Sequence, residues 1–132
     1  MTDLEKALDF FSKDTYASET TGIQIDEVGE HKAVCSLEIT SAHKNAYGGV
    51  MGGAIFTLAD YTFAVASNFN SVQTVSLSSN ISFTGMAKGK KLIAESTLLK
   101  DGRSTCLYGI SIRDELDTKV AYVTVNGMKL SR

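Results

Sequence analysis

The sequence predicts an α+β domain in which a mostly antiparallel sheet packs against one long central helix. The chain has 132 residues, of which 43% are hydrophobic and 21% charged, so it has the size and composition of one globular domain with a substantial core. The patterned segments run in the order helix, two strands, long helix, four strands, which favours this architecture. We therefore treat residues 1–132 as a single domain.

The first three elements are a short helix and a hairpin. Thr2 followed by Glu5 is typical of a capping box, and apolar residues then recur at helical spacing at Leu4, Ala7, Leu8 and Phe11. Residues 22–28 and 33–39 each alternate apolar and polar side chains and flank a turn, as expected for a β-hairpin.

The long helix is expected from Gly52 to about Asn68, because small and straight-chain apolar residues occur on all of its sides. Four β-patterned segments follow it: TVSLSSNISF, KLIAESTLL, STCLYGISIR and VAYVTVNGMKL. In the first of them one face is mainly apolar, and the other is polar but uncharged. Such a hydroxyl-lined face fits a partner subunit or a substrate cleft better than open water.

Charge and terminal composition exclude several classes of function. The formal net charge is −2 and there is no basic run with interleaved aromatic residues, so we expect no nucleic-acid partner. The acidic start is unlike a signal peptide, and Asp60 interrupts the longest apolar stretch, so we expect a cytoplasmic protein without membrane association. His31 and Cys35 share a strand face, but two ligands do not make a metal site, and we expect none.

Asp60 is the one side chain between Lys44 and Lys88 that is charged at neutral pH. A carboxylate in an apolar helix costs several kcal/mol, on the order of the buried-ion penalty, unless it is paired, hydrogen-bonded or solvated. One interpretation is that Asp60 reaches a wet groove or caps a loop. The other is that it is an acid retained for chemistry.

Two glycine pairs precede this aspartate. Gly48, Gly49, Gly52 and Gly53 let the backbone turn sharply where the helix begins, and free N–H groups there can hold an oxyanion. Gly52 or Gly53 lies roughly 10 to 12 Å from Asp60 along a helix axis. Because one carbonyl cannot contact both ends, a shared reaction requires the two ends to come from different subunits of a dimer.

The segment HKNAYGGVMGGAIFTLAD, from His43 to Asp60, resembles the pattern H-x-N-x-x-G-x-x-H-G-G-x-x-x-x-x-x-D of the hotdog-fold acyl-CoA thioesterases of the PaaI type. The resemblance extends through NISF, GKKLIAE, DGRS and VAYVT. It implies a hotdog fold, with the long helix wrapped by an antiparallel sheet of about six strands and preceded by a short N-terminal helix. It also implies a homodimer with shared active sites, and a dimer of dimers in many members.

The resemblance assigns roles to residues of this chain. Asp60 is implied as general base or nucleophile, and Gly52 or Gly53 as the backbone donor to the thioester carbonyl. Asn45 would orient water or substrate, and Ser76 would assist the attacking water. The substrate-binding candidates are His43, Met51, Tyr61, Thr74, Lys88, Lys90, Lys91, Arg103 and Ser104, of which the basic residues and Ser104 lie where phosphates or pantetheine of coenzyme A are held.

These implied roles define an acyl-CoA hydrolase that needs no cofactor other than the coenzyme A of its substrate. Each role has a structural alternative. Asn45 could simply brace its loop, and the lysines could be solvated turn residues.

Met51 departs from the pattern, which has histidine at this position. Methionine neither donates a hydrogen bond nor transfers a proton, so turnover would be slower or would rely on the helix start and Asp60. The alternative function is a non-catalytic acyl-CoA or acyl-carrier binding protein, with Met51 filling the reactive corner; retention of Asp60 argues against it. A hydratase or dehydratase would need a histidine near the carboxylate, and neither His31 nor His43 lies on the long helix.

Overall fold

A computed structural model describes residues 1–130; Ser131 and Arg132, the end of the expected domain, lie outside the described residues. Helix α1 (Asp3–Phe11) begins at Thr2, whose hydroxyl accepts the N–H of Glu5 at 3.1 Å. The Glu5 carboxylate in turn accepts the N–H of Thr2 at 2.8 Å. The capping box predicted from the sequence is therefore formed.

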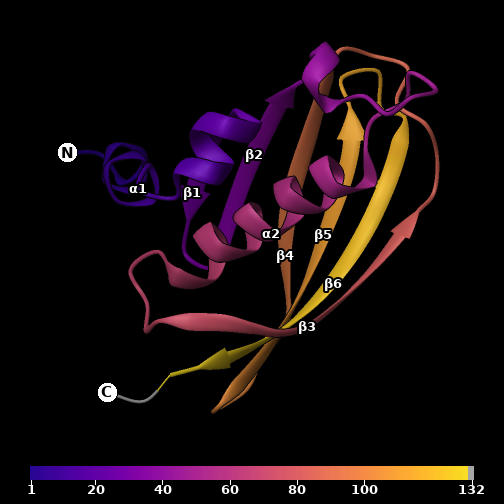
Figure 1. The fold of residues 1–132 in the computed structure, drawn as a ribbon. Coiled ribbons are helices and arrows are strands. Elements are labelled where there is room, and N and C mark those ends of the chain that lie inside the picture. Colours follow the sequence, from indigo (N-terminus) through magenta and orange to yellow (C-terminus); the bar gives the residue numbers. More distant parts are fainter. Residues whose placement is uncertain (131–132) are drawn as a thin grey trace.

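Six strands form one antiparallel sheet within residues 1–130. They are β1 (Ile23–Gly29), β2 (Lys32–Glu38), β3 (Thr74–Phe83), β4 (Lys91–Asp101), β5 (Thr105–Asp114) and β6 (Lys119–Lys129). Their spatial order is β1-β2-β4-β5-β6-β3, so the N-terminal hairpin forms one edge of the sheet and β3 forms the other (Figure 1). Two short helical turns, η1 (Tyr16–Thr21) and η2 (Ser41–His43), were not predicted, because they are too short to show a periodicity.

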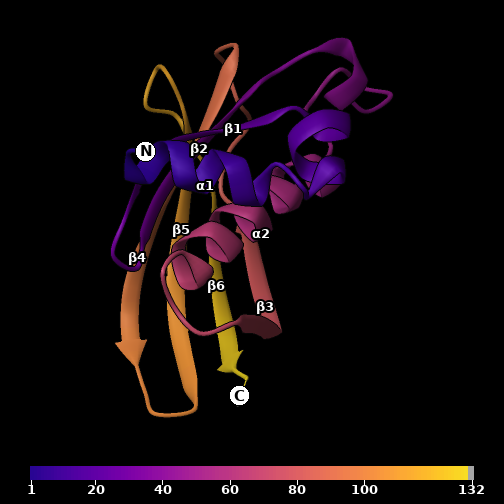
Figure 2. The same ribbon diagram turned by 90° about the vertical axis from the view of Figure 1, so that its left-hand side faces the viewer.

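Helix α2 (Gly52–Asn68) lies along one face of the curved sheet (Figures 1 and 2). Leu58 and Val65 on its inner side are fully buried, and Phe63 packs edge-on against Tyr108 of β5 with 5.5 Å between ring centroids. The hydroxyl of Tyr61 donates to the carbonyl of Phe11 at 2.9 Å and so fixes α1 to α2. The predicted α+β hotdog architecture, with a long helix held by an antiparallel sheet, is confirmed.

Strand β3 is exposed on the face that the sequence shows to be mainly apolar. Leu77 is 56% exposed, and Val75 and Phe83 are exposed as well. A bulge between Ser76 and Ser78 leaves Leu77 without a partner on β6 and breaks the alternation. Because β3 is an edge strand, it has one neighbouring strand, β6, in the described sheet, and little of its surface is covered by the rest of the chain.

The direction of β3 brings it back along α2. The Asn68 side chain at the end of α2 accepts the N–H of Thr74 at 2.7 Å and donates to the Thr74 carbonyl at 3.1 Å. At the other end of the strand, Phe83 lies against Gly52, the first residue of α2. β3 therefore runs from the C-terminal turn of the helix to its N-terminus. In residues 1–130 no helix is both long and apolar enough to cross a membrane.

Candidate active site

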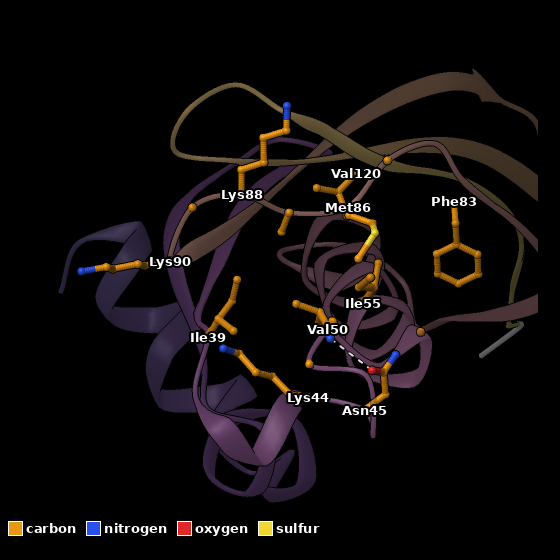
Figure 3. A pocket seen from close by; sticks show the side chains of 16 residues that line it. Ile39, Lys44, Asn45, Val50, Ile55, Phe83, Met86, Lys88, Lys90 and Val120 are labelled. Carbon is orange, nitrogen blue, oxygen red and sulfur yellow. Dashed lines mark hydrogen bonds between the residues drawn. The ribbon is translucent and has the colours of Figure 1, made fainter.

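A cavity of about 660 Å³ lies at the N-terminus of α2 (Figure 3). Its walls come from the loop before α2 and from the segment that joins β3 to β4. We call it the helix-end pocket, and its lining side chains include Ile39, Lys44, Asn45, Val50, Ile55, Phe83, Met86, Lys88, Lys90 and Val120. The pocket thus brings together Asn45, Gly52, Lys88 and Lys90 from the predicted site.

Asn45 shapes the loop that leads into the pocket. Its side-chain oxygen accepts the N–H groups of Tyr47 at 2.9 Å and Gly49 at 3.1 Å. Gly48 has a φ of 87°, a left-handed conformation that suits glycine. In Figure 3 the amide nitrogen of Asn45 faces the cavity. Asn45 therefore braces its loop and also presents a hydrogen-bond donor to the pocket.

The first turn of α2 has unpaired donors. Met51 is the N-cap residue, and its side chain makes no capping hydrogen bond. The Met51 carbonyl accepts the N–H groups of Ala54 at 3.0 Å and Ile55 at 3.2 Å. By helix geometry the N–H groups of Gly52 and Gly53 have no intrahelical acceptor. Free N–H groups and the positive end of a helix dipole are features that suit an anion, and Gly52 is the one of the two residues that lines the pocket.

Gly52 and Met51 occupy this corner in different ways. A Cβ atom at Gly52 would lie 3.0 Å from Cζ of Phe83, so the absence of a side chain permits a close approach. The Met51 side chain is 48% exposed and does not line the helix-end pocket.

His43 is held by two hydrogen bonds to the backbone. Its Nδ1 accepts the N–H of Thr40 at 3.0 Å, so Nε2 carries the proton and donates to the carbonyl of Thr21 at 2.7 Å. The carbonyl of His43 accepts the N–H of Met51 at 2.8 Å. This arrangement positions the start of α2 and leaves the ring no free nitrogen for substrate.

Asp60 lies on the exposed face of α2, outside the helix-end pocket. Neighbouring protein atoms partly desolvate its carboxylate, and the negative charge of Asp14 adds to this effect; both raise the pKa of Asp60. In residues 1–130 no hydrogen bond or ion pair holds this carboxylate. Eight residues of helix, about 12 Å, separate it from Gly52. A single chain therefore keeps Asp60 apart from the N-terminus of α2.

Three further candidates lie near the second half of α2. Ser76 is exposed on β3 in the stretch between the two contacts of that strand with α2. Thr74 is buried, and its hydroxyl donates to the carbonyl of Val72 at 3.1 Å. Tyr61 is buried and bonded to Phe11. Ser76 is open to a partner or substrate, whereas Thr74 and Tyr61 make structural contacts.

The basic candidates fall into two groups. Lys88 and Lys90 line the helix-end pocket, and Lys91 begins β4 beside them. Lys44, which the sequence analysis did not select, lies on the opposite wall (Figure 3). Arg103 and Ser104 lie in the turn between β4 and β5, at the far end of β4 from Lys91. The single chain does not bring this second group to the pocket.

Two acids missed by the sequence analysis hold the lysine segment in place. The Asp114 carboxylate accepts the N–H groups of Lys88 at 2.8 Å and Gly89 at 2.9 Å, and Glu115 accepts the N–H of Lys90 at 2.8 Å. Burial alone would raise the pKa of Asp114, but these and further hydrogen bonds lower it well below its ordinary value. The signal that the sequence offered was the pair Asp114 and Glu115, which directly follows the β-patterned segment STCLYGISIR.

A curved antiparallel sheet around one long helix is the hotdog fold. A helix N-terminus with free N–H groups beside a pocket is an arrangement that suits the stabilisation of an oxyanion in acyl transfer. The chain belongs to the thioesterase superfamily, whose sequence model matches residues 47–121. Within the superfamily it is of the PaaI type, as the sequence motif indicated. The predicted enzyme class, thioester hydrolase, is confirmed at the level of the family.

Individual relatives agree with this placement. The acyl-coenzyme A thioesterase PaaI of Escherichia coli is 31% identical over 106 residues, which are 79% of this chain and 75% of the relative. The structure of E. coli PaaI has a TM-score of 0.89 at 23% identity, over 98% of this chain and 94% of that one. A hypothetical thioesterase of Streptococcus pneumoniae, solved with coenzyme A, has a TM-score of 0.84 at 21% identity, over 95% and 98% of the two chains.

Proposed function

We propose that the protein is an acyl-CoA thioesterase whose active site is assembled from two chains. The helix-end pocket of one chain binds the coenzyme A portion and the thioester carbonyl. The other chain supplies Asp60 and Ser76. The observation that carries this proposal is the roughly 12 Å between Gly52 and Asp60, because neither half can complete the reaction within its own chain.

The pocket suits a coenzyme A thioester. Lys44, Lys88 and Lys90 line the pocket, and ammonium groups attract phosphate. In residues 1–130 none of the three is part of a salt bridge. The coenzyme A in the S. pneumoniae relative supports the same class of ligand. In the assembled dimer Arg103 and Ser104 would reach the partner's site, and two dimers would pair as a dimer of dimers.

The proposed reaction uses Asp60 as a general base. Water attacks the thioester carbon while the Asp60 carboxylate accepts its proton, and Ser76 and Asn45 orient the reacting groups. The N–H groups of Gly52 and Gly53 stabilise the oxyanion. The carbon–sulfur bond then breaks, and the departing thiolate takes the proton from Asp60. In a single turnover in ¹⁸O-water the general-base route puts the label in the product acid alone, whereas label in the Asp60 carboxylate would identify direct attack by Asp60 followed by attack of water on the Asp60 carbonyl.

The decisive test is replacement of Asp60. Asp60→Asn and Asp60→Ala should lower kcat for acyl-CoA hydrolysis by about 10²- to 10⁴-fold, the range for loss of a general base. Asp26→Asn, which changes an exposed acid on the far edge strand, is the matched control. Full activity in both Asp60 variants would refute the proposal.

Mixing two inactive variants tests the shared site. Chains with Asp60→Asn and chains with Asn45→Ala each lack one half of every site, but a mixed dimer contains one intact site. Random mixing should restore about a quarter of the wild-type activity, because half of the dimers are mixed and each has one active site of two. No recovery on mixing would place both halves in one chain.

A further inference from the structure

Two serines of β3 face the long helix because of the bulge in that strand. Ser76 pairs with Gly127 of β6 and Ser79 pairs with Val125, and paired residues have their side chains on one face of a sheet. Val125 is 1% exposed in the core, and a Cβ atom at Gly127 would lie 2.9 Å from the ring of Phe63 on α2. In a regular strand Ser76 and Ser79 would face opposite sides, but the bulge turns both toward α2.

The serine between them faces the other way. Ser78 pairs with Asn126, and its hydroxyl accepts the side-chain N–H of Asn126 at 3.2 Å. Ser78 and Ser79 are thus neighbours in the sequence with side chains on opposite faces of the same edge strand.

Ser79 lies at the level of Asp60 along the helix. Gly52 and Phe83 are in contact where α2 begins and β3 ends, and this contact gives the two elements a common end. From it, Asp60 lies about 12 Å along α2 and Ser79 about 13 Å along β3. Ser76 lies about 23 Å from the same end, nearer to the C-terminus of α2.

The direction of Asp60 around the helix agrees with this position. Successive residues of an α-helix are about 100° apart, so Asp60 is about 60° from Phe63 and about 100° from Tyr61. Phe63 faces β5 and β6, whereas Tyr61 faces α1. Asp60 is therefore turned more toward the side of the helix on which β3 follows β6 than toward α1.

The hydroxyl of Ser79 is available for a ligand. Ser79 is exposed, and within residues 1–130 its side chain makes no hydrogen bond, in contrast to Ser78. A serine hydroxyl accepts hydrogen bonds as well as donating them. An acceptor of this kind, at the level of an unpaired carboxylate, suits a water molecule that has two O–H groups to give.

We infer that Ser79 is a further catalytic residue, which binds the attacking water together with Asp60 of the same chain. The Asp60 carboxylate accepts one O–H group of the water and takes its proton, and the oxygen of Ser79 accepts the other O–H group. A lone pair of the water then faces the thioester carbon. The proton, the thiolate and the product acid are accounted for as in the reaction above. This inference rests on the proposed function, because it takes Asp60 as the general base.

Methanol, a nucleophile with a single O–H group, tests the inference. Asp60 can accept the proton of methanol, but methanol has no second O–H group to give to Ser79. In dilute methanol, Ser79→Ala should lower kcat for hydrolysis of an acyl-CoA about tenfold, the effect of one neutral hydrogen bond, and leave the rate of methyl ester formation nearly unchanged. The ratio of methyl ester to free acid should therefore rise about tenfold.

Two matched variants accompany this measurement. Ser79→Thr keeps the hydroxyl in a residue that suits a strand, and it should keep the wild-type product ratio. Ser78→Ala removes the neighbouring hydroxyl from the opposite face, and it should keep both the wild-type rate and the wild-type ratio. Unchanged circular dichroism of each variant ensures that the comparison is between folded enzymes.

The outcomes separate the two proposals. If Asp60→Asn is inactive and Ser79→Ala keeps the wild-type product ratio, Ser79 does not bind the attacking water, and the proposed function stands. An equal rise of the ratio in Ser78→Ala would also overturn the inference, because that hydroxyl faces away from α2. If Asp60→Asn retains full activity, the proposed function fails and this inference fails with it.

Discussion

The carboxylate of Asp114, at the end of β5, accepts a hydrogen bond from the backbone N–H of Lys88 at 2.8 Å. Asp114 is fully buried, whereas the Lys88 side chain extends from the outer wall of the helix-end pocket. A buried acid thus fixes the backbone position of an exposed cation. The lysine segment is held in place before any substrate arrives, which reduces the ordering needed on binding.

Asp114→Asn should weaken substrate binding without removing any proposed reacting group. The amide cannot accept the same set of N–H groups as a carboxylate, so the segment around Lys88 should loosen. We expect a several-fold higher KM for acyl-CoA and little change in kcat. Hydrolysis of an acyl-pantetheine, which lacks the nucleotide phosphates, should be affected less. An equal loss with both substrates would contradict a role through the lysines.

The same residue predicts a dependence of stability on pH. The pKa of folded Asp114 lies below the ordinary value of 3.8, so its stabilising effect is complete above pH 3.8 and is lost as the pH falls below it. The thermal unfolding temperature of the wild type should therefore fall as the pH is lowered below about 4. Asp114→Asn should be less stable at neutral pH and should show a shallower decline in acid.

Asp60 predicts the acid limb of the activity profile. A general base must be deprotonated, so kcat/KM should fall as the pH drops through the Asp60 pKa, which is raised above 3.8 by desolvation and by Asp14. Asp14→Asn should move this limb to lower pH. An unmoved limb would show that Asp14 has no influence on the base.

The raised pKa of Asp60 has a second consequence, for stability. Its favourable contribution is complete below pH 3.8 and is lost as the pH rises through the folded-state pKa, so the ionised group is unfavourable at neutral pH. Asp60→Asn should consequently unfold at a higher temperature than the wild type at pH 7, while being inactive. Calorimetry at pH 7 checks this trade of stability for function.

Met51→His should raise kcat if a side-chain donor at the helix start assists thioester activation. The residue is exposed at the N-cap of α2, so histidine can be accommodated there without repacking the core. A gain of about tenfold corresponds to one added neutral hydrogen bond in the transition state. An unchanged kcat would show that the backbone donors and Asp60 suffice.

Gly52→Ala should impair the helix start because its Cβ would lie 3.0 Å from the ring of Phe83. We expect kcat to fall by about an order of magnitude, since a small displacement of a donor has a large effect on rate. The double variant Gly52→Ala, Phe83→Leu should recover much of the loss, because the shorter side chain relieves the contact. Absence of recovery would mean that the effect does not arise from this contact.

Much of the fold was readable from the sequence because its signals are local. The box at Thr2 and Glu5, the apolar helix from Gly52 to Asn68 and the alternating strands each depend on neighbouring residues, and they were confirmed. The burial of β3 was not readable, since it depends on which strand lies at the sheet edge.

Candidate site residues could be proposed from the sequence only where they lie in one segment of the chain. The glycines, Asn45 and Asp60 all belong to one motif. Asp114 and Lys44 contribute through contacts between segments distant in sequence, and single-sequence patterns do not reveal such contacts. Tyr61 was a substrate-binding candidate, but the helical period turns it toward the core.

The two edges of the sheet are chemically unequal. β1 carries Asp26 and Glu27 and has a bulge there, features that discourage further strands from adding. β3 has no charged residue. The sheet can therefore be extended through β3 only once. Pairing of two copies along β3 would use both uncharged edges, and the two edges that remain would be the charged β1 strands. Pairing along the strand that would complete the active site would therefore limit growth of the sheet to two chains and prevent a fibre.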